Sequence, residues 1–410
     1  MTTAVQVQYR RGSAAQVASF TGAAGELVVD TTNNRVVVED GATAGGFPAA
    51  KLSEVVTSVA SSGGSTISQS GGVATIGEPG GFLNQFRNGA MDVWQRGTSM
   101  STLAATGTFY YTADGWMVES SGAAASWAQA GGRLLTKNSL QVTGATGVTD
   151  VQIKQRIESL MAARFSGQTV TVQAQIYNNT GAAITPTLTV NRPTAQDNYA
   201  SVATDVNAVG LQSCPNGQWT RVAYTFAANA AAYNGLEILF DFGNNFSAST
   251  KSIQITELDI RATPGVATGL NALPPPPELR PINIELAFCQ RYFASSFLNG
   301  VAPADDSVQQ NYSGPAPAAT LAQVSFIPFP VPMRATPAMT FYSPNVGTPS
   351  AGEWSVDIGG TWNAATATAI AGGGSAISAL NFAVNVTLSG GLAVNGCYVI
   401  GGSWTASAEL

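Results

Sequence analysis

The chain has 410 residues, a net charge of −6 and no histidine. Only 10% of its residues are charged, against the usual quarter or so, and it holds no basic run and no apolar stretch of about 20 residues, so neither nucleic-acid binding nor membrane insertion is expected. Without histidine, Ser-His-Asp and Cys-His catalysis and the usual zinc sites are excluded, and we expect no cofactor.

The N-terminal 51 residues predict a compact β unit. Residues 5–9 alternate between apolar and polar, residues 14–20 suit a short helix, and residues 26–40 suit a hairpin that turns at Asn33-Asn34. The predicted buried residues of this hairpin are Leu27, Val29, Val36 and Val38. A unit this short buries little core alone, so we expect it to be stabilised by self-association.

Residues 52–81 form a connector rich in Ser and Gly. Residues 52–59 place apolar side chains at helical spacing and suit a short three-stranded coiled coil, whereas residues 67–76 suit a small hairpin. A disordered linker is the alternative for this segment.

Residues 82–263 predict one β-sandwich, because short β-prone runs are separated by turn signals at sandwich-like intervals. The expected strands are residues 91–94, 114–119, 126–130, 140–142, 151–158, 169–178, 187–190, 220–227, 236–242 and 252–260. Residues 264–281 read as a linker, since four consecutive prolines from Pro274 cannot donate ladder hydrogen bonds and favour a stiff extended segment.

Residues 282–410 predict a second β-sandwich. Its first part, residues 283–293, can bury one apolar surface formed by Ile284, Leu286, Ala287, Phe288 and Tyr292. The expected strands are residues 320–329, 339–342, 354–358, 383–386 and 397–404. The three cysteines, Cys214, Cys289 and Cys397, are widely spaced, which predicts buried free thiols rather than a disulfide framework.

Several motifs resemble segments of bacteriophage tail and fibre proteins. The run Asn88-Gly89-x-x-x-x-Trp94-Gln-Arg-Gly is similar to the opening strand of their jelly-roll modules, and residues 253–260 are similar to the last strand of carbohydrate-binding modules. Residues 280–293 and the ending 402–410 resemble segments of the same protein group. Residues 9–12 with 25–41 resemble the small N-terminal domain of phage tropism-determinant and tail-fibre proteins.

The resemblance implies an elongated, all-β homotrimer located in the virion and made in the host cytoplasm. Its N-terminal unit would contact other virion proteins, its central jelly roll would serve as a spacer or glycan binder, and its C-terminal domain would face the host. Two alternatives stay open: a structural fibre or head-decoration protein without a specific receptor, and a glycan-degrading spike.

Paired carboxylates would be needed for a glycan-degrading enzyme. Glu237 and Asp241 lie on one face of an expected strand about 13 Å apart, too far for a retaining pair. Glu257 and Asp259 suit a solvated face, with a structural calcium as the alternative that the resemblance suggests, and the acidic pair at 305–306 suits a turn. We therefore expect no enzymatic activity and no metal.

Aromatic residues are the better functional signal, because sugars stack on exposed rings. Trp94, Trp116, Trp127 and Trp219 lie in strand motifs and are expected in the core. The candidates for glycan or receptor binding are Arg192, Asp197, Asn198 and Tyr199 in a polar loop, and Tyr342, Trp354 and Trp362 beside loops of the C-terminal domain.

Overall fold

The computed structural model describes residues 9–49, 66–70, 73–77, 82–103, 107–305, 310–343, 352–369 and 377–410. The chain divides into two compact units, the first of residues 1–61 and 65–79 and the second of residues 62–64 and 80–410. It is 47% strand and 8% helix, which confirms the all-β prediction. Among the described residues, no helix is long and apolar enough to cross a membrane. The predicted coiled coil at 52–59 lies outside the described residues.

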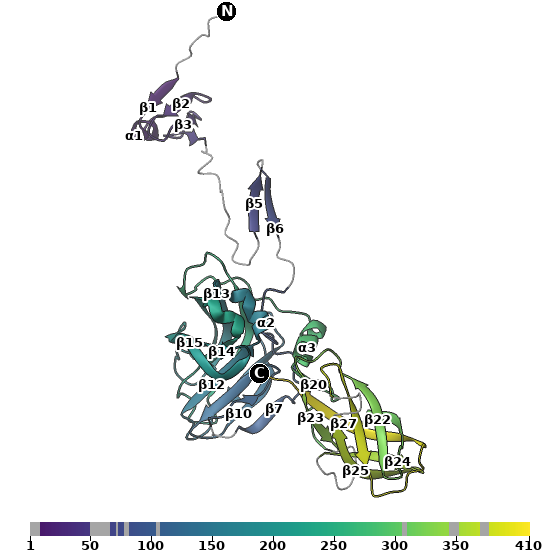
Figure 1. Cartoon of the computed structure of the whole chain (residues 1–410). Helices are drawn as coiled ribbons and strands as arrows, with labels where there is room; N and C mark the ends of the chain where they lie inside the picture. The colour runs from purple at the N-terminus through teal and green to yellow at the C-terminus, as the bar shows by residue number, and fades with distance from the viewer. Residues whose placement is uncertain are drawn as a thin grey trace, which may run out of the picture. The chain divides into compact units, whose positions relative to one another are not determined.

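The N-terminal unit is a four-stranded sheet of order β1-β2-β3-β4 with one short helix (Figure 1). Its elements are β1 (Arg10–Gly12), α1 (Ala14–Ala18), β2 (Leu27–Asp30), β3 (Arg35–Val38) and β4 (Phe47–Pro48). A capping box of Ser13 and Gln16 starts α1. The Asp30 carboxylate accepts the backbone N–H groups of Thr32 and Asn33, which fixes the predicted turn between β2 and β3.

The predicted hairpin forms, but the prediction of its buried face was wrong. Val28 and Val37 are paired across the strands and form the small core with Val17. The neighbouring pair Leu27 and Val38 points to the other face, where these side chains are 38% and 42% exposed. A shift of one residue exchanges the two faces of a strand. The unit therefore presents an exposed hairpin face, which consists of Leu27, Val36, Val38 and Phe47.

The predicted hairpin in the connector is confirmed. Strands β5 (Thr66–Ser70) and β6 (Val73–Gly77) pair antiparallel, with Ile67 opposite Ile76.

The central domain is a β-sandwich built around one core. Its seven-stranded sheet has the order β19-β16-β13-β18-β11-β10-β7, and its six-stranded sheet has the order β15-β14-β17-β12-β9-β8. The first sheet contains β7 (Ser99–Leu103), β10 (Ala125–Gly131), β11 (Asn138–Thr143), β13 (Thr169–Asn179), β16 (Gln218–Ala227), β18 (Ser252–Ala262) and β19 (Gly269–Leu270). The second contains β8 (Tyr110–Tyr111), β9 (Met117–Ser121), β12 (Asp150–Ile157), β14 (Thr187–Ala195), β15 (Asn198–Gly210) and β17 (Leu236–Asp241).

Three short helical segments connect these strands, namely α2 (Ser159–Ala162), η1 (Ala163–Phe165) and η2 (Ala230–Asn234). Buried side chains from both sheets form a continuous core that includes the predicted Trp94, Trp116 and Trp127. The fourth tryptophan, Trp219, is half-buried and packs on Tyr177.

The predicted opening strand at 91–94 is not a strand. The Asn88 side chain accepts the backbone N–H groups of Asp92 and Val93 and donates to the Val93 carbonyl, so it folds the chain into a buried turn. A Cβ at Gly89 would lie 2.2 Å from the Leu258 carbonyl oxygen, so this position tolerates only glycine. The Asn-Gly motif thus serves local chain geometry.

The proline-rich segment packs on the jelly roll. Pro274 and Pro275 are buried, and the Pro275 carbonyl accepts a hydrogen bond from Gln173. The N–H of Glu278 donates to Asp259. Because β19 also pairs with β16, this stretch extends the sandwich.

The C-terminal β domain follows α3 (Ile282–Gln290) and forms an eight-stranded sheet around its own core. Its strands are β20 (Phe293–Ser295), β21 (Gln310–Pro315), β22 (Leu321–Pro328), β23 (Ala338–Tyr342), β24 (Glu353–Ile358), β25 (Thr361–Ala369), β26 (Asn381–Thr387) and β27 (Cys397–Ser407). The long β27 pairs with β21 and β24 through its first half and with β20 and β23 through its second half.

Helix α3 buries a different surface from the one predicted. Ile284, Leu286, Ala287 and Phe288 are only half-buried, whereas Tyr292 is buried as expected. The helix instead buries Glu285, whose carboxylate accepts the Asn88 N–H at 2.6 Å and binds Arg280 at 2.9 Å. The prediction for the cysteines holds for Cys214 and Cys289 and is wrong for Cys397, which is exposed.

Candidate functional site

The outer face of the six-stranded sheet carries a ladder of polar side chains. Along β12, residues 151, 153 and 157 are buried in the core, whereas Gln152, Lys154 and Arg156 alternate with them. Gln152 lies opposite Asp241 of β17, and Arg156 lies opposite Glu237. We call this surface the polar face; it consists of Gln152, Lys154, Arg156, Asn191, Glu237 and Asp241.

Glu237 is the centre of an ion cluster on the polar face. Its Oε2 lies 2.9 Å from both Lys154 Nζ and Arg156 Nε, and its Oε1 accepts from Asn191. Burial acts to raise the pKa of Glu237, but the two cations hold it below its usual value. The Lys154 ammonium also lies 3.7 Å from the centre of the Phe109 ring. The cluster is therefore charged at neutral pH and fixes several side chains in place.

A pair of interacting carboxyl groups, Asp150 and Asp241, lies beside this cluster. Burial, followed by the charge of Asp241, raises the pKa of Asp150 to about 6. Gln152 Nε2 bridges the pair at 2.8 Å from Asp150 Oδ2 and 3.3 Å from Asp241 Oδ2. Glycosidases hold their two carboxyl groups roughly 5 to 10 Å apart, with the sugar between them. Because Asp150 and Asp241 contact each other, they leave no room for this arrangement.

The predicted polar loop at 191–199 is the hairpin between β14 and β15, and most of its candidate side chains are engaged within the fold. Arg192 binds Asp205 at 2.9 Å. Asp197 accepts the N–H and hydroxyl of Ser159, and the Tyr199 hydroxyl donates to the Ile157 carbonyl at 2.7 Å. Asn198 is exposed.

The three aromatic candidates of the C-terminal domain lie on three different strands. Trp354 of β24 is fully buried, stacks on Tyr312 and donates to the Ser403 carbonyl, so its prediction as a binding residue was wrong. Tyr342 of β23 is half-buried against Phe297, whereas Trp362 of β25 is 38% exposed. Of the three, Trp362 is the one whose ring is most open to a partner.

The prediction of a solvated acidic face at the end of the jelly roll is also wrong. Glu257 and Asp259 are both buried. The Asp259 carboxylate accepts hydrogen bonds from Arg261 and from the Glu278 N–H, so it is engaged with a cation of the protein itself. Within the described ranges, no group of three or more His, Cys, Asp or Glu side chains could hold a metal ion. Asp305 accepts the Ser343 N–H, and Asp306 lies outside the described residues.

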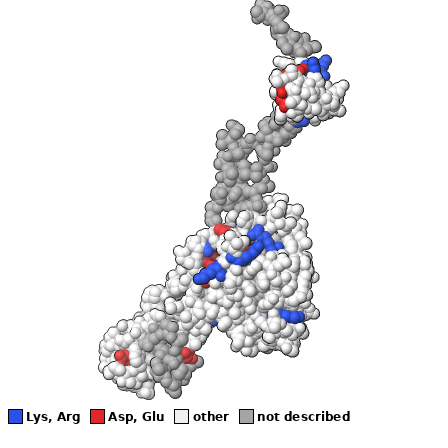
Figure 2. Space-filling view, turned by 180° about the vertical axis from the view of Figure 1, so that it is seen from behind, with Lys and Arg blue, Asp and Glu red and all other residues white. Residues whose placement is uncertain are grey.

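Sequence reasoning considered Glu237 and Asp241 only as catalytic acids and missed Gln152, Lys154 and Arg156. The available signal was the alternation of Val151, Ile153 and Ile157 with Gln152, Lys154 and Arg156, which Gln155 alone interrupts and which places the polar set on one face of a strand. Figure 2 shows that Lys, Arg, Asp and Glu are sparse on this side of the molecule and gather mainly in one area of the larger body.

Comparisons with known proteins find a match for the N-terminal unit. Residues 7–43 match the family described as the Major tropism determinant N-terminal domain, which confirms the predicted resemblance. The tail fiber receptor-binding protein of Bordetella phage BPP-1 is 61% identical over 57 residues, which are 14% of this chain and 14% of that protein. The chain thus matches only a small part of the length of that relative.

Solved structures that align with part of this chain share little sequence with it. The CBM22-1 xylan-binding domain from Paenibacillus barcinonensis Xyn10C is 16% identical and aligns over 40% of this chain and 100% of its own length, with a TM-score of 0.27. The enzymatically active domain of bacteriophage CBA120 tailspike protein 4 is also 16% identical, over 44% of this chain and 21% of its own, with a TM-score of 0.27. Similarity at this level bears on neither function nor ligand.

Proposed function

We propose that the chain is a fibre protein of a phage or phage-derived particle, which attaches to the virion through its N-terminal unit and binds a host surface glycan through its second unit. The observation that carries the proposal is the 61% identity of 57 residues to a tail fiber receptor-binding protein. A virion location and synthesis in the host cytoplasm belong to the same proposal.

The exposed hairpin face supports assembly as a homotrimer. Leu27, Val38 and Phe47 lie next to each other across β2, β3 and β4, and Phe47 is 61% exposed. An apolar row of this kind costs free energy in water and is buried when copies associate symmetrically. The unit's own core is small, so association would add a large share of its stability.

Light scattering of the purified chain tests the trimer. We expect a mass three times the 42.0 kDa of one chain. Val38→Asp should shift the mass toward the monomer, because it places a charge in the apolar row. Val202→Asp is the matched control, since Val202 is 41% exposed on β15 of the other unit. A wild-type monomer at micromolar concentration would contradict the homotrimer.

The polar face supports glycan binding without hydrolysis. Its Gln, Asn, Lys and Arg side chains supply donors, and its carboxylates supply acceptors, which is the chemistry that recognises sugar hydroxyls. The adjoining carboxyl groups, Asp150 and Asp241, interact with each other and leave no room for a sugar between them. Weak binding at each site would be raised by several copies acting together.

Competition for host cells tests receptor binding. The purified full chain should block adsorption of the particle to susceptible bacteria, and it should release no reducing ends from their polysaccharide. Gln152→Ala and Asn191→Ala should each weaken cell binding by ~10-fold, which corresponds to the loss of about one or two hydrogen bonds. Gln141→Ala is the matched control, because Gln141 is half-buried on the other sheet. A chain that binds particles but never cells would favour the purely structural fibre or head decoration.

A further inference from the structure

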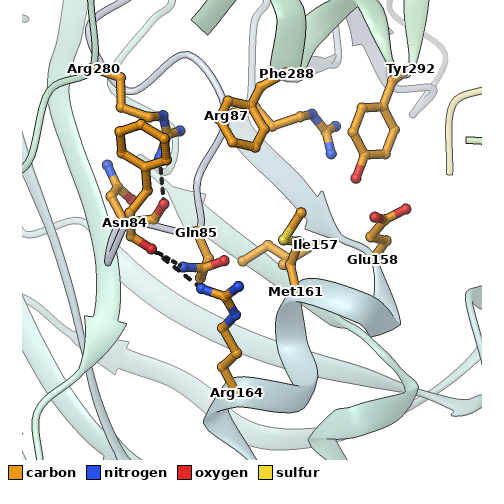
Figure 3. A pocket seen from close by; sticks show the side chains of 11 residues that line it. Asn84, Gln85, Arg87, Ile157, Glu158, Met161, Arg164, Arg280, Phe288 and Tyr292 are labelled. Atoms are coloured by element: carbon orange, nitrogen blue, oxygen red, sulfur yellow. Dashed lines mark hydrogen bonds between the residues drawn. The ribbon is translucent and has the colours of Figure 1, made fainter. Parts of the chain in front are cut away.

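A pocket distinct from the polar face lies between the segment that enters the jelly roll, α2 and α3 (Figure 3). Its volume is about 210 Å³, which is below the roughly 300 to 1,000 Å³ of drug-sized ligand sites and suits a single sugar ring. Ile157 and Tyr292 of its lining are buried, whereas Met161 is half-buried and Arg164 is exposed. The pocket therefore has a fixed floor and an open rim.

Arg87 in this lining has an incomplete set of hydrogen bonds. Its side chain is 7% exposed, and its guanidinium stacks 3.6 Å from the centre of the Tyr292 ring. Among the described residues, Nη1 donates to the Arg156 carbonyl over a long 3.4 Å, Nη2 lies 3.6 Å from Glu409 Oε2, and Nε has no acceptor. A buried guanidinium with several unused donors is costly, and an acceptor in the pocket that reaches its Nη groups would relieve part of that cost.

Arg280 in the same lining shows what a satisfied arginine looks like. It binds both carboxylate oxygens of Glu285 and donates to the carbonyls of Asn84 and Phe86. This arginine is structural and offers nothing to a ligand. Compared with Arg280, Arg87 is the arginine of the pocket floor that still has N–H donors without a strong acceptor.

A second cation stands at the rim. Arg164 follows α2, is exposed, and forms no ion pair within the part of the chain that the structure describes. Its one hydrogen bond donates from Nη1 to the Phe82 carbonyl at 3.5 Å, which is weak. Gln85 donates to the same carbonyl at 3.0 Å. In Figure 3, Gln85 and Arg164 border one side of the pocket, and Arg87, Tyr292 and Glu158 border the other.

The remaining walls suit a sugar ring with hydroxyl groups. Phe82 and Phe288 meet edge to face, with ring centres 5.8 Å apart, and give an apolar wall against which the C–H groups of a sugar can pack. Glu158 is held by Arg291 at 3.1 Å and remains an acceptor. Burial raises the pKa of Tyr292 to about 12, so its hydroxyl stays protonated at neutral pH.

We propose that this pocket binds the terminal sugar of an acidic glycan, a monosaccharide that bears a carboxylate. The ligand's carboxylate lies toward Arg164 at the rim, and its hydroxyl groups lie toward Arg87, Glu158 and Tyr292 on the opposite side. The Glu158 carboxylate disfavours a ligand that is anionic at both ends, so a bare phosphate fits less well. This inference rests on the proposed receptor-binding function and names the chemical class of the receptor.

Saturation-transfer NMR and titration calorimetry with the full chain test this inference. The probes are glucuronate and N-acetylneuraminate, with glucose as the neutral sugar and acetate as the bare carboxylate. We expect both acidic sugars to bind with a Kd near the millimolar range and glucose and acetate to bind at least ten times more weakly. Glucose binding as tightly as the acidic sugars would overturn the proposal. Acetate binding equally well would show an adventitious ion only and would also overturn it. The absence of binding by any probe would overturn it too.

Variants assign the binding to the pocket. Arg164→Gln should weaken acidic-sugar binding at least tenfold and leave glucose binding unchanged, because it removes the exposed cation. Lys137→Gln is the matched control, since Lys137 is an exposed cation of the same sandwich outside the pocket. Met161→Trp fills the rim and should abolish binding while the thermal midpoint stays near that of the wild type. Equal losses in the Arg164 and Lys137 variants would point to nonspecific attraction and contradict the assignment.

Cell binding separates this inference from the proposed function. If the chain binds host cells and neither Arg164→Gln nor an excess of acidic sugar reduces that binding, the pocket is not the receptor site and the receptor-binding function stands. If the chain binds acidic sugars in solution but no cells, the receptor-binding function fails and the pocket stands as a sugar site.

Discussion

Replacing Arg96 by methionine should destabilise the second unit strongly, and more at pH 8 than at pH 5. Arg96 binds Asp114 of the jelly roll at 3.1 Å and Glu409 at 2.9 Å, and its guanidinium lies 3.6 Å from the centre of the Phe293 ring. Breaking one partner of a buried ion pair costs about 3 to 5 kcal/mol, because the other charge stays buried. Methionine keeps the apolar contacts, so the loss reports the charge.

The pH dependence follows from Asp114. Burial raises its pKa to about 6 even with Arg96 in place, and losing that cation raises the pKa further. Above pH 6, the wild-type carboxyl is ionised while the variant must protonate it or bury an unpaired charge. Each pH unit of that window adds about 1.4 kcal/mol to the cost of the variant, so the loss at pH 8 should exceed the loss at pH 5 by up to about 3 kcal/mol.

Urea unfolding followed by tryptophan fluorescence at both pH values measures this difference. Adding Asp114→Asn to the Arg96→Met variant should recover much of the stability at pH 8 and remove the pH dependence, because position 114 then carries no charge and Glu409 keeps Arg87 as its partner. Lys137→Met is the surface control and should stay within about 0.5 kcal/mol of the wild type. A loss below about 1 kcal/mol at pH 8, or equal losses at both pH values, would refute the reasoning.

Three further changes have outcomes that the structure specifies. Asp150, whose pKa is raised to about 6, contributes stability that falls as pH rises through the window from about 4 to 6, so Asp150→Asn should stabilise the chain by about 1 kcal/mol at pH 8 and have no effect at pH 4 in urea unfolding. Thiol titration of the native chain should modify Cys397 alone, with the other two cysteines reacting only after denaturation; rapid labelling of all three would contradict their burial. Gly402→Ala should unfold the C-terminal domain, because its Cβ would lie 2.1 Å from the Trp354 ring, whereas Gly131→Ala meets nothing within 4 Å and should be nearly neutral in thermal melts.

Strong period-two segments were predictable and contiguous apolar runs were not. The strand expected at 169–178 is β13 (Thr169–Asn179), and the one expected at 252–260 is β18 (Ser252–Ala262). In the N-terminal hairpin, by contrast, residues 27–29 and 36–38 are apolar without interruption, so the sequence does not say which face is buried. The face predicted to be buried is therefore the opposite of the observed one, because the two sets of residues differ by one position along the strand.

The candidate site was less predictable because residue type does not reveal burial. Trp354 was expected beside a loop, yet its ring lies under Gly402 of β27, far along the chain, and only tertiary packing brings the two together. β15 was missed because it is an edge strand with few buried residues, which gives a weak strand pattern. The pocket lining comes from residues up to 210 positions apart in the sequence, Phe82 to Tyr292, so no local pattern could have shown it.

The motifs that the sequence singled out converge on one joint between the jelly roll and the C-terminal domain. From the segment 82–97, Arg87 and Arg96 reach Glu409 of the chain's ending, and the Gln95 side chain donates to the Phe293 carbonyl. From the segment 280–293, Arg280 binds the carbonyls of Asn84 and Phe86, and α3 contacts the Asn88 N–H through Glu285. Polar groups that each of these segments buries are therefore paired with groups of another of these segments.

This joint gives the motifs a structural reason to occur together, and it bears on how the pocket works. The pocket is lined by residues of two of these segments and borders the third through Arg87 and Glu409. A ligand that completes the hydrogen bonds of Arg87 would therefore also stabilise the joint by mass action, since it binds only the assembled arrangement. Saturating glucuronate should accordingly raise the unfolding midpoint of the wild-type chain and should leave that of Arg164→Gln unchanged. An equal rise in both would place the ligand elsewhere on the molecule.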